Sequence, residues 1–158
     1  WRAMKEMGIG MAMCPGNIHQ AVAMDFPVSM GGYEYTKTPD DPCILHMRSA
    51  PLGDTIGAPP VEQFRDARTR MLGMTFNDYE AEIRGHLGGM LPKGLFDFDR
   101  DVASLSINRW AHGYSYGSPG IVGRQAFGRI TIANSDAVDS SLLQSAVEQA
   151  WRAVKELG

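Results

Sequence analysis

The chain has 158 residues, of which 44% are hydrophobic, and its net charge is −3, from 15 basic and 18 acidic side chains. This balance argues against a polybasic binder of nucleic acid or membrane surfaces. No apolar run reaches the roughly 18 residues of a membrane span. The chain contains 18 glycines and 9 prolines. Together they exceed the usual share of about 12%, which predicts many turns and argues against an all-helical bundle.

The first half of the chain alternates short apolar segments with turns. Residues 1–8 resemble the tail of a helix that ends at Gly8. Residues 9–25 fit a strand and a helix equally well. We predict a β-hairpin with Phe26–Tyr35 and Cys43–Arg48 as its strands, and with a turn at residues 38–42. A glycine pair interrupts the first of these strands, which indicates a bulge or a turn there.

Two helices are predicted in the middle of the chain. The first covers Val61–Leu72. Before the second, Thr75 and Asp78 have the spacing of an N-terminal capping box. Phe76, Tyr79, Ile83 and Leu87 then share one face of the helix, which we expect to end near residues 88–92.

The last third of the chain predicts two strands and a helix. Val102–Trp110 alternates apolar and polar residues as a half-buried strand does. Gly128–Asn134 is rich in β-branched residues and predicts a second strand. Ser140 or Ser141 can cap a final helix that reaches Leu157. The apolar stripe of that helix consists of Leu143, Val147, Ala150, Trp151 and Val154.

The junction between this last strand and the helix is the first candidate site. Ligands of open α/β sheets bind beyond the carboxyl ends of strands, and a helix N-terminus there offers free N–H groups. The carboxylate of Asp136 can accept a hydrogen bond from a sugar-like hydroxyl, with Asn134, Ser135, Ser140 and Ser141 close by in the sequence. The alternative is that Asp136 only forms a turn or caps the helix.

The second candidate site is the segment 108–114. Trp110, His112 and Tyr114 can line a flat apolar slot with polar tips, or they can form an ordinary aromatic cluster that supports a loop. The four histidines are far apart and lack metal-ligand spacing, so no metal site is predicted. No G-x-S-x-G and no complete G-x-G-x-x-G is present. The ten methionines are interpreted as flexible core filler.

Three segments together resemble the C-terminal part of bacterial flavin-dependent oxidoreductases. They are R-D-V-A-S-L-S-I-N-R-W-A-H-G-Y-S-Y (100–116), G-R-Q-A-F-G-R-I-T-I-A-N-S-D-A (123–137) and S-A-V-E-Q-A-W-R-A-V-K-E-L (145–157). The nearest type is the spermidine dehydrogenase-like branch of the flavin amine oxidases. The segments D-F-P-V-S-M-G-G-Y-E-Y, L-H-M-R-S-A-P and T-F-N-D-Y-E-A-E-I-R resemble the substrate domain of that branch.

The resemblance implies an α+β fold that is a fragment of an α/β enzyme. Residues 1–100 would form part of the substrate-binding cap domain, with a mixed sheet and helices. Residues 101–158 would return to a Rossmann-like FAD-binding domain and supply its last strand and helix. The dinucleotide-binding segment is expected to precede residue 1, so the chain alone is not expected to retain FAD.

The resemblance also implies roles for individual residues. Asp136 matches an acidic position that contacts the FAD ribityl or pyrophosphate region, and Ser140 and Ser141 would approach the flavin pyrimidine edge. Asn134 and Ser135 are expected to belong to the same cofactor-binding site. Trp110 would lie near the isoalloxazine ring, as would His112 and Tyr114. The expected reaction is oxidation of an amine C–N bond by hydride transfer to the flavin.

The substrate is expected to be a small amine, and a polyamine is one candidate. Its remote ammonium would bind carboxylates or aromatic faces. The candidates are Glu34, Asp40 and Asp41, with Tyr33 and Tyr35, and the alternative is that they form a solvated hairpin tip. Two other functions stay open. One is a non-catalytic remnant that binds a ligand or a partner, and the other is a desaturase-type flavin enzyme that acts on an apolar substrate. The compartment is undetermined, with the periplasm allowed by the resemblance.

Overall fold

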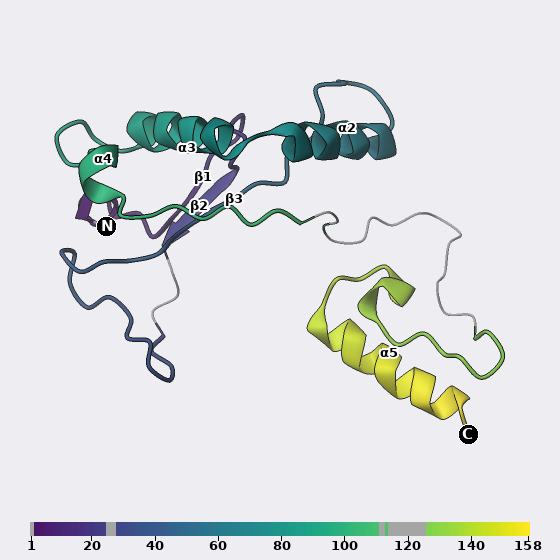
Figure 1. Cartoon of the computed structure of the whole chain (residues 1–158). Coiled ribbons are helices and arrows are strands. Elements are labelled where there is room, and N and C mark those ends of the chain that lie inside the picture. Colours follow the sequence, from purple (N-terminus) through teal and green to yellow (C-terminus); the bar gives the residue numbers. More distant parts are fainter. Residues whose placement is uncertain (1, 25–27, 111–112, 114–125) are drawn as a thin grey trace. The chain divides into compact units, whose positions relative to one another are not determined.

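The computed structural model describes residues 2–24, 28–110, 113 and 126–158 (Figure 1). The chain divides into two units, Trp1–Arg109 and Trp110–Gly158. The fold is α+β, with a small antiparallel sheet and several helices. Among the described residues, no helix has the length and hydrophobicity needed to cross a membrane.

The sheet of the first unit has three strands in the order β1-β2-β3, namely Met11–Met13, Ala21–Met24 and Leu45–Arg48. Both pairs are antiparallel, and Val22 at the centre pairs with Ala12 on one side and Met47 on the other. Residues 9–25, for which strand and helix were both open, therefore contain two strands. Strands this short give no clear hydrophobic period, because they show only one or two alternations.

The predicted hairpin between Phe26–Tyr35 and Cys43–Arg48 is wrong in its pairing. The strand β3 pairs with β2, while the described residues 28–35 contain a tight turn. In that turn, Met30 and Tyr33 exchange backbone hydrogen bonds of 3.1 Å, and Gly31 has a φ of +60°. The glycine pair thus reverses the chain, which favours the turn over the bulge as the interpretation of Gly31-Gly32.

Three helices of the first unit follow the sequence signals closely, and the short fourth one was not predicted. Helix α1 covers Arg2–Glu6 and α2 covers Pro60–Gly73, while α3 covers Phe76–Met90 and the short α4 covers Phe98–Asp101. The capping box of α3 is confirmed, since the Thr75 hydroxyl accepts from the backbone N–H of Asp78 and the Asp78 carboxylate accepts from the N–H of Thr75.

The core of the first unit lies where α1 and β2 pack against α3. Val22 is fully buried in it, and Ile83 and Leu87 are buried on the predicted face of α3. Tyr79 is buried on the same face, whereas Phe76 at the first turn is half exposed. Figure 1 shows the three strands alongside α3. The sheet and α3 therefore share one hydrophobic cluster.

The predicted strand Val102–Trp110 is not formed, although its alternation has a structural basis. The segment is irregular, and Leu105 and Ile107 pack against the core cluster while Ala103 is exposed. Alternation selects which side chains face the core. A strand also needs a neighbour that shares its backbone hydrogen bonds, and no such ladder is formed by the described residues 102–110.

The second unit consists of a turn, the 3₁₀ helix η1 (Ser135–Val138) and the helix α5 (Leu143–Glu156). The predicted strand Gly128–Asn134 is wrong, because Phe127 and Ile130 close a tight turn at Gly128, whose φ is +58°. The predicted cap at Ser140 or Ser141 is also wrong, since α5 begins at Leu143. The α+β class holds, but the described residues of this unit contain no Rossmann-like strand.

Candidate functional site

The predicted cofactor-binding residues lie together in the turn that precedes α5. Asn134 caps η1, because its side-chain oxygen accepts a 3.0 Å hydrogen bond from the backbone N–H of Ala137. Asp136 stands inside η1 with its side chain exposed. The cap therefore occupies the oxygen of Asn134, whereas the exposed carboxylate of Asp136 remains accessible to a ligand.

The serines at the end of this turn do not cap α5. The hydroxyl of Ser145 donates a 2.9 Å hydrogen bond to the hydroxyl of Ser140, and the N–H of Ser140 donates to the carbonyl of Ser135. Leu142 occupies the N-cap position and supplies no side-chain acceptor. The first N–H groups of a helix have no partner within the helix. The start of α5 is thus suited to meet the oxygen atoms of a ligand.

Arg152 connects α5 to the segment that precedes η1. Its guanidinium donates a 2.6 Å hydrogen bond to the backbone carbonyl of Ile132, and it also binds Gln149 at 2.8 Å and Glu156 at 2.5 Å. Ala153 on the same face of α5 is buried. These contacts fix the position of the turn that carries Asp136.

The opposite face of α5 is apolar and exposed. Its stripe is the one that the sequence predicts, and 78% of the Leu143 surface and 63% of the Trp151 surface are accessible. Val147 and Val154 are also exposed, and the ammonium of Lys155 lies 3.6 Å from the centre of the Trp151 ring. The helix therefore buries its more polar face, with Gln149, and exposes its more apolar one.

The aromatic slot is only partly described. Trp110 is 82% exposed, and His112 and Tyr114 lie outside the described residues. The structure therefore does not test whether these three predicted catalytic residues meet.

The predicted substrate-binding residues lie on an exposed segment next to the Met30–Tyr33 turn. Glu34 forms an ion pair of 2.9 Å with Lys37, and the backbone N–H of Tyr35 donates to the hydroxyl of Ser29. The neighbouring carboxylate of Asp41 accepts from the N–H groups of Thr38 and Lys37, and these bonds lower its pKa. The acidic groups of this loop therefore already have partners, although the exposed pair at Glu34 is readily exchanged.

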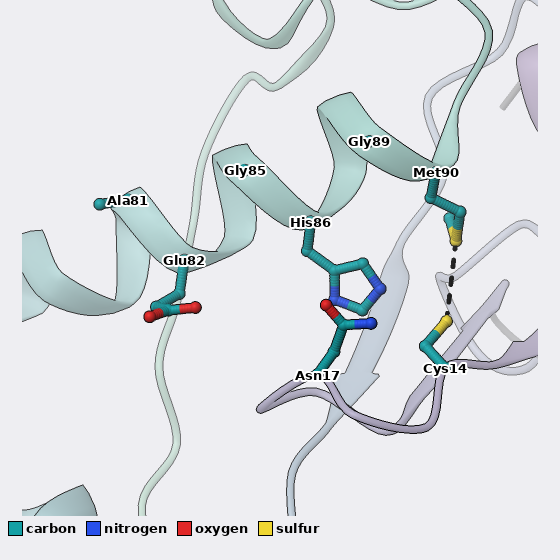
Figure 2. Close-up of a pocket in the computed structure, with 8 residues that line it drawn as sticks. All are labelled: Cys14, Asn17, Ala81, Glu82, Gly85, His86, Gly89 and Met90. Carbon is teal, nitrogen blue, oxygen red and sulfur yellow. Dashed lines mark hydrogen bonds between the residues drawn. The ribbon is translucent and has the colours of Figure 1, made fainter.

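The structure also contains a cavity that the sequence did not predict. Figure 2 shows it beside α3, with a volume of about 630 Å³. Cys14 and Asn17 line it from the connection between β1 and β2, and Glu82, His86 and Met90 line it from α3. The thiol sulfur of Cys14 lies 4.0 Å from the thioether sulfur of Met90.

Two imidazoles lie next to this cavity, the buried His19 and the half-buried His86. The rings of His19 and His86 have their centres 6.3 Å apart. Nδ1 of His19 and both ring nitrogens of His86 are buried without a hydrogen-bond partner among the described residues. Burial lowers the pKa of each imidazole, and for His19 the nearby His86 adds to the effect.

One signal in the sequence could have pointed to part of this cavity. Residues Glu82, His86 and Met90 follow at intervals of four and so share one face of α3. Cys14 could not have been added to them, because it is 76 residues away from Met90. In the described part of the chain, no group of three or more His, Cys, Asp or Glu side chains is arranged to hold a metal ion.

The comparisons with known proteins assign no family. No protein-family model matches the chain, and the search of curated proteins likewise finds no match. The functional assignment therefore depends on the residues themselves and on the sequence resemblance described above.

Proposed function

We propose that the chain is part of an FAD-dependent oxidoreductase that oxidises the C–N bond of an amine, of the spermidine dehydrogenase-like type. The observation that carries this proposal is the turn before α5. There the exposed carboxylate of Asp136 and a helix start without a side-chain cap lie within one short segment. A carboxylate accepts hydrogen bonds from hydroxyls, and helix N–H groups donate to carbonyl or phosphate oxygens.

These groups fit the polar part of a flavin nucleotide. FAD, when bound, supplies the hydride acceptor. Asp136 would accept hydrogen bonds from the ribityl hydroxyls, and the first turn of α5, with Ser140 and Ser141 just before it, would face the pyrimidine edge. The partial positive charge of the α5 N-terminus favours negative charge at that edge. Asn134 and Ser135 would hold the turn in shape, since Asn134 caps η1.

The apolar stripe of α5 supports the same proposal. Burying one large apolar side chain stabilises a fold by about 1.5–3 kcal/mol, and α5 has four such side chains exposed, namely Leu143, Val147, Trp151 and Val154. We propose that they pack against an FAD-binding segment encoded outside these 158 residues. In that arrangement α5 would be the last helix of a Rossmann-like domain.

The substrate side of the proposal concerns an amine. Hydride transfer requires that the amine next to the reacting carbon is neutral. An aromatic slot formed by Trp110, His112 and Tyr114 would favour the neutral amine, because an apolar surrounding disfavours the charged ammonium. A second, charged nitrogen would bind near Tyr33, Glu34 and Tyr35, where it would replace Lys37 as the partner of Glu34. This pattern favours polyamines over apolar substrates.

The test uses the full-length protein and the 158-residue chain side by side. After extensive dialysis, we expect flavin absorbance in the full-length protein and none in the short chain, and we expect amines to reduce the bound flavin. Asp136→Asn should lower flavin retention, whereas Asp139→Asn, in the same turn, should not. A full-length protein without flavin would overturn the proposal. Reduction by apolar polyenes but not by amines would favour the desaturase-type alternative.

A further inference from the structure

We propose that Cys14, His86 and Met90 form a binding site for a soft monovalent metal ion, Cu(I). The three side chains line the cavity beside α3 (Figure 2). They combine a thiol, an imidazole and a thioether, which are ligands that Cu(I) prefers over harder ions. The site is separate from the turn at Asp136, and the inference does not depend on the proposed flavin chemistry.

The separation of the two sulfur atoms fits a shared ion. Sulfur–metal bonds in proteins are about 2.3 Å long, as in zinc thiolates. Two sulfurs bound to one ion at an angle near 120° are therefore about 4 Å apart, by the geometry of such bonds. The observed separation of Cys14 Sγ and Met90 Sδ is 4.0 Å. An ion can thus bridge them with little movement of either side chain.

The imidazole of His86 supplies the third ligand. His86 and Met90 are four residues apart on α3, so their side chains leave the helix on the same face. Figure 2 shows the His86 ring and the Cys14–Met90 sulfur pair on the same side of α3. Both of its nitrogens are buried without a hydrogen-bond partner among the described residues. A neutral imidazole has one nitrogen lone pair available for a metal, and binding would use it.

The ligand set selects the ion. Zinc prefers four ligands from thiolate, imidazole and carboxylate groups, and the described residues offer no cluster of three such side chains. Glu82 lies one turn before His86 on α3, and its hard carboxylate does not favour Cu(I). His19 is only 4% exposed, and its ring centre lies 6.3 Å from that of His86.

Binding is a ligand exchange without a redox step. The Cys14 thiol loses its proton to the buffer, and the thiolate, the thioether and the imidazole nitrogen each form a bond to Cu(I). The ion keeps its charge throughout, so no oxidant or reductant takes part in the binding reaction.

The test is an anaerobic titration of the 158-residue chain with Cu(I) in competition with a chromophoric Cu(I) chelator. We expect one ion per chain. Cys14→Ser, Met90→Leu and His86→Gln should each weaken binding by at least about tenfold, the lower range for perturbed metal sites. Matched controls are Cys43→Ser, the other free cysteine, and Met13→Leu, an exposed methionine. Neither control should change the affinity.

X-ray absorption of the loaded chain gives a second readout that does not depend on variants. We expect two sulfur atoms and one nitrogen around the copper, and circular dichroism should show that Met90→Leu keeps the fold. Equal loss of binding in Cys14→Ser and Cys43→Ser would overturn the proposal. Tighter binding of Zn(II) than of Cu(I), or copper with oxygen ligands only, would overturn it as well.

Discussion

The guanidinium of Arg152 donates a 2.6 Å hydrogen bond to the backbone carbonyl of Ile132, and this bond joins α5 to the segment that leads into η1. The two residues are 20 positions apart. Among the described residues of the second unit, the buried side chains are those of Ala137, Gln149 and Ala153, none of which is a large apolar group. The position of Asp136 therefore depends on a polar contact more than on a large core.

We expect Arg152→Ala to loosen the second unit. A hydrogen bond to a charged group contributes about 1.5–3 kcal/mol, and the variant leaves the carbonyl of Ile132 without this donor. Amide hydrogen exchange of η1 and of α5 from Ala146 onward should become faster, with that of α3 unchanged. Arg152→Lys should rescue only part of the protection, because lysine lacks the planar fork of arginine. Unchanged exchange in Arg152→Ala would contradict this role.

The capping box of α3 gives a second prediction. Thr75→Ala removes the acceptor of the Asp78 N–H and should destabilise the chain by about 1 kcal/mol. Thr75→Ser keeps the hydroxyl and should be close to neutral. Urea denaturation followed by circular dichroism measures both variants. Equal stability of the alanine and serine variants would show that the cap is not needed.

The hydrophobic core gives a third prediction. Ile83 is buried between α3 and the sheet, and Ile83→Ala should cost about 2–5 kcal/mol, the range for large-to-small core substitutions. Ile56 is 98% exposed and serves as the matched control. Ile56→Ala should leave the midpoint of urea unfolding unchanged. A smaller loss at Ile83 than at Ile56 would contradict the described core.

The pH dependence of stability follows from Asp101. A side-chain hydrogen bond from Arg100, followed by a backbone bond from Asp97, lowers the pKa of Asp101 to about 2, from an ordinary value of 3.8. A carboxyl with a lowered folded-state pKa stabilises the fold above its unfolded-state pKa and loses that contribution as the pH falls through the folded value. Stability should therefore decline between about pH 4 and pH 2.

Asp101→Asn should flatten this acid decline, and Asp139→Asn, a change at an exposed residue of the second unit, should leave it in place. The effect is expected to be small, because the side chain is about one third exposed and water screens the pair. Urea midpoints at several pH values measure it. If the urea midpoint of Asp101→Asn fell with pH as steeply as that of the unchanged chain, other carboxyls would cause the acid sensitivity.

The exposed stripe of α5 gives the last prediction. In the 158-residue chain, Val147→Asp should have little effect on stability, since Val147 is exposed there. In the full-length protein, the same change should lower both stability and flavin retention, because it places a charge in the proposed contact with the FAD-binding segment. Glu148→Asp, at the neighbouring position, is the control. Equal small effects in both proteins would contradict the packing role of α5.

The sequence was sufficient for the local features of the helix α3. The helix α3, its cap at Thr75 and its buried face with Ile83 and Leu87 were all predicted, because caps and helical periodicity depend on residues a few positions apart. The pairing of β3 with β2 was not predicted. Pairing depends on a partner elsewhere in the chain, and neither the composition nor the period of Cys43–Arg48 specifies that partner.

The same limit applies to the candidate sites. The residues from Asn134 to Ser141 were predicted to lie together, since they are neighbours in the chain, but the strand expected before them is absent from the described residues. β-branched residues such as Ile130 and Ile132 favour an extended backbone, yet only a neighbouring strand makes it part of a sheet. Cys14, His86 and Met90 come together through tertiary packing, so their meeting could be found only in the structure.

The wall that α3 presents to the cavity has a consequence for engineering. Gly85 and Gly89 line this wall, and a methyl group added at Gly85, Gly88 or Gly89 would touch no other atom within 4 Å. Glycine inside a helix costs about 1 kcal/mol relative to alanine. Alanine at these positions is thus a route to a more heat-resistant chain. At Gly85 and Gly89 the added methyl group would also narrow the cavity, and so hinder solutes that approach the sulfur atoms of Cys14 and Met90.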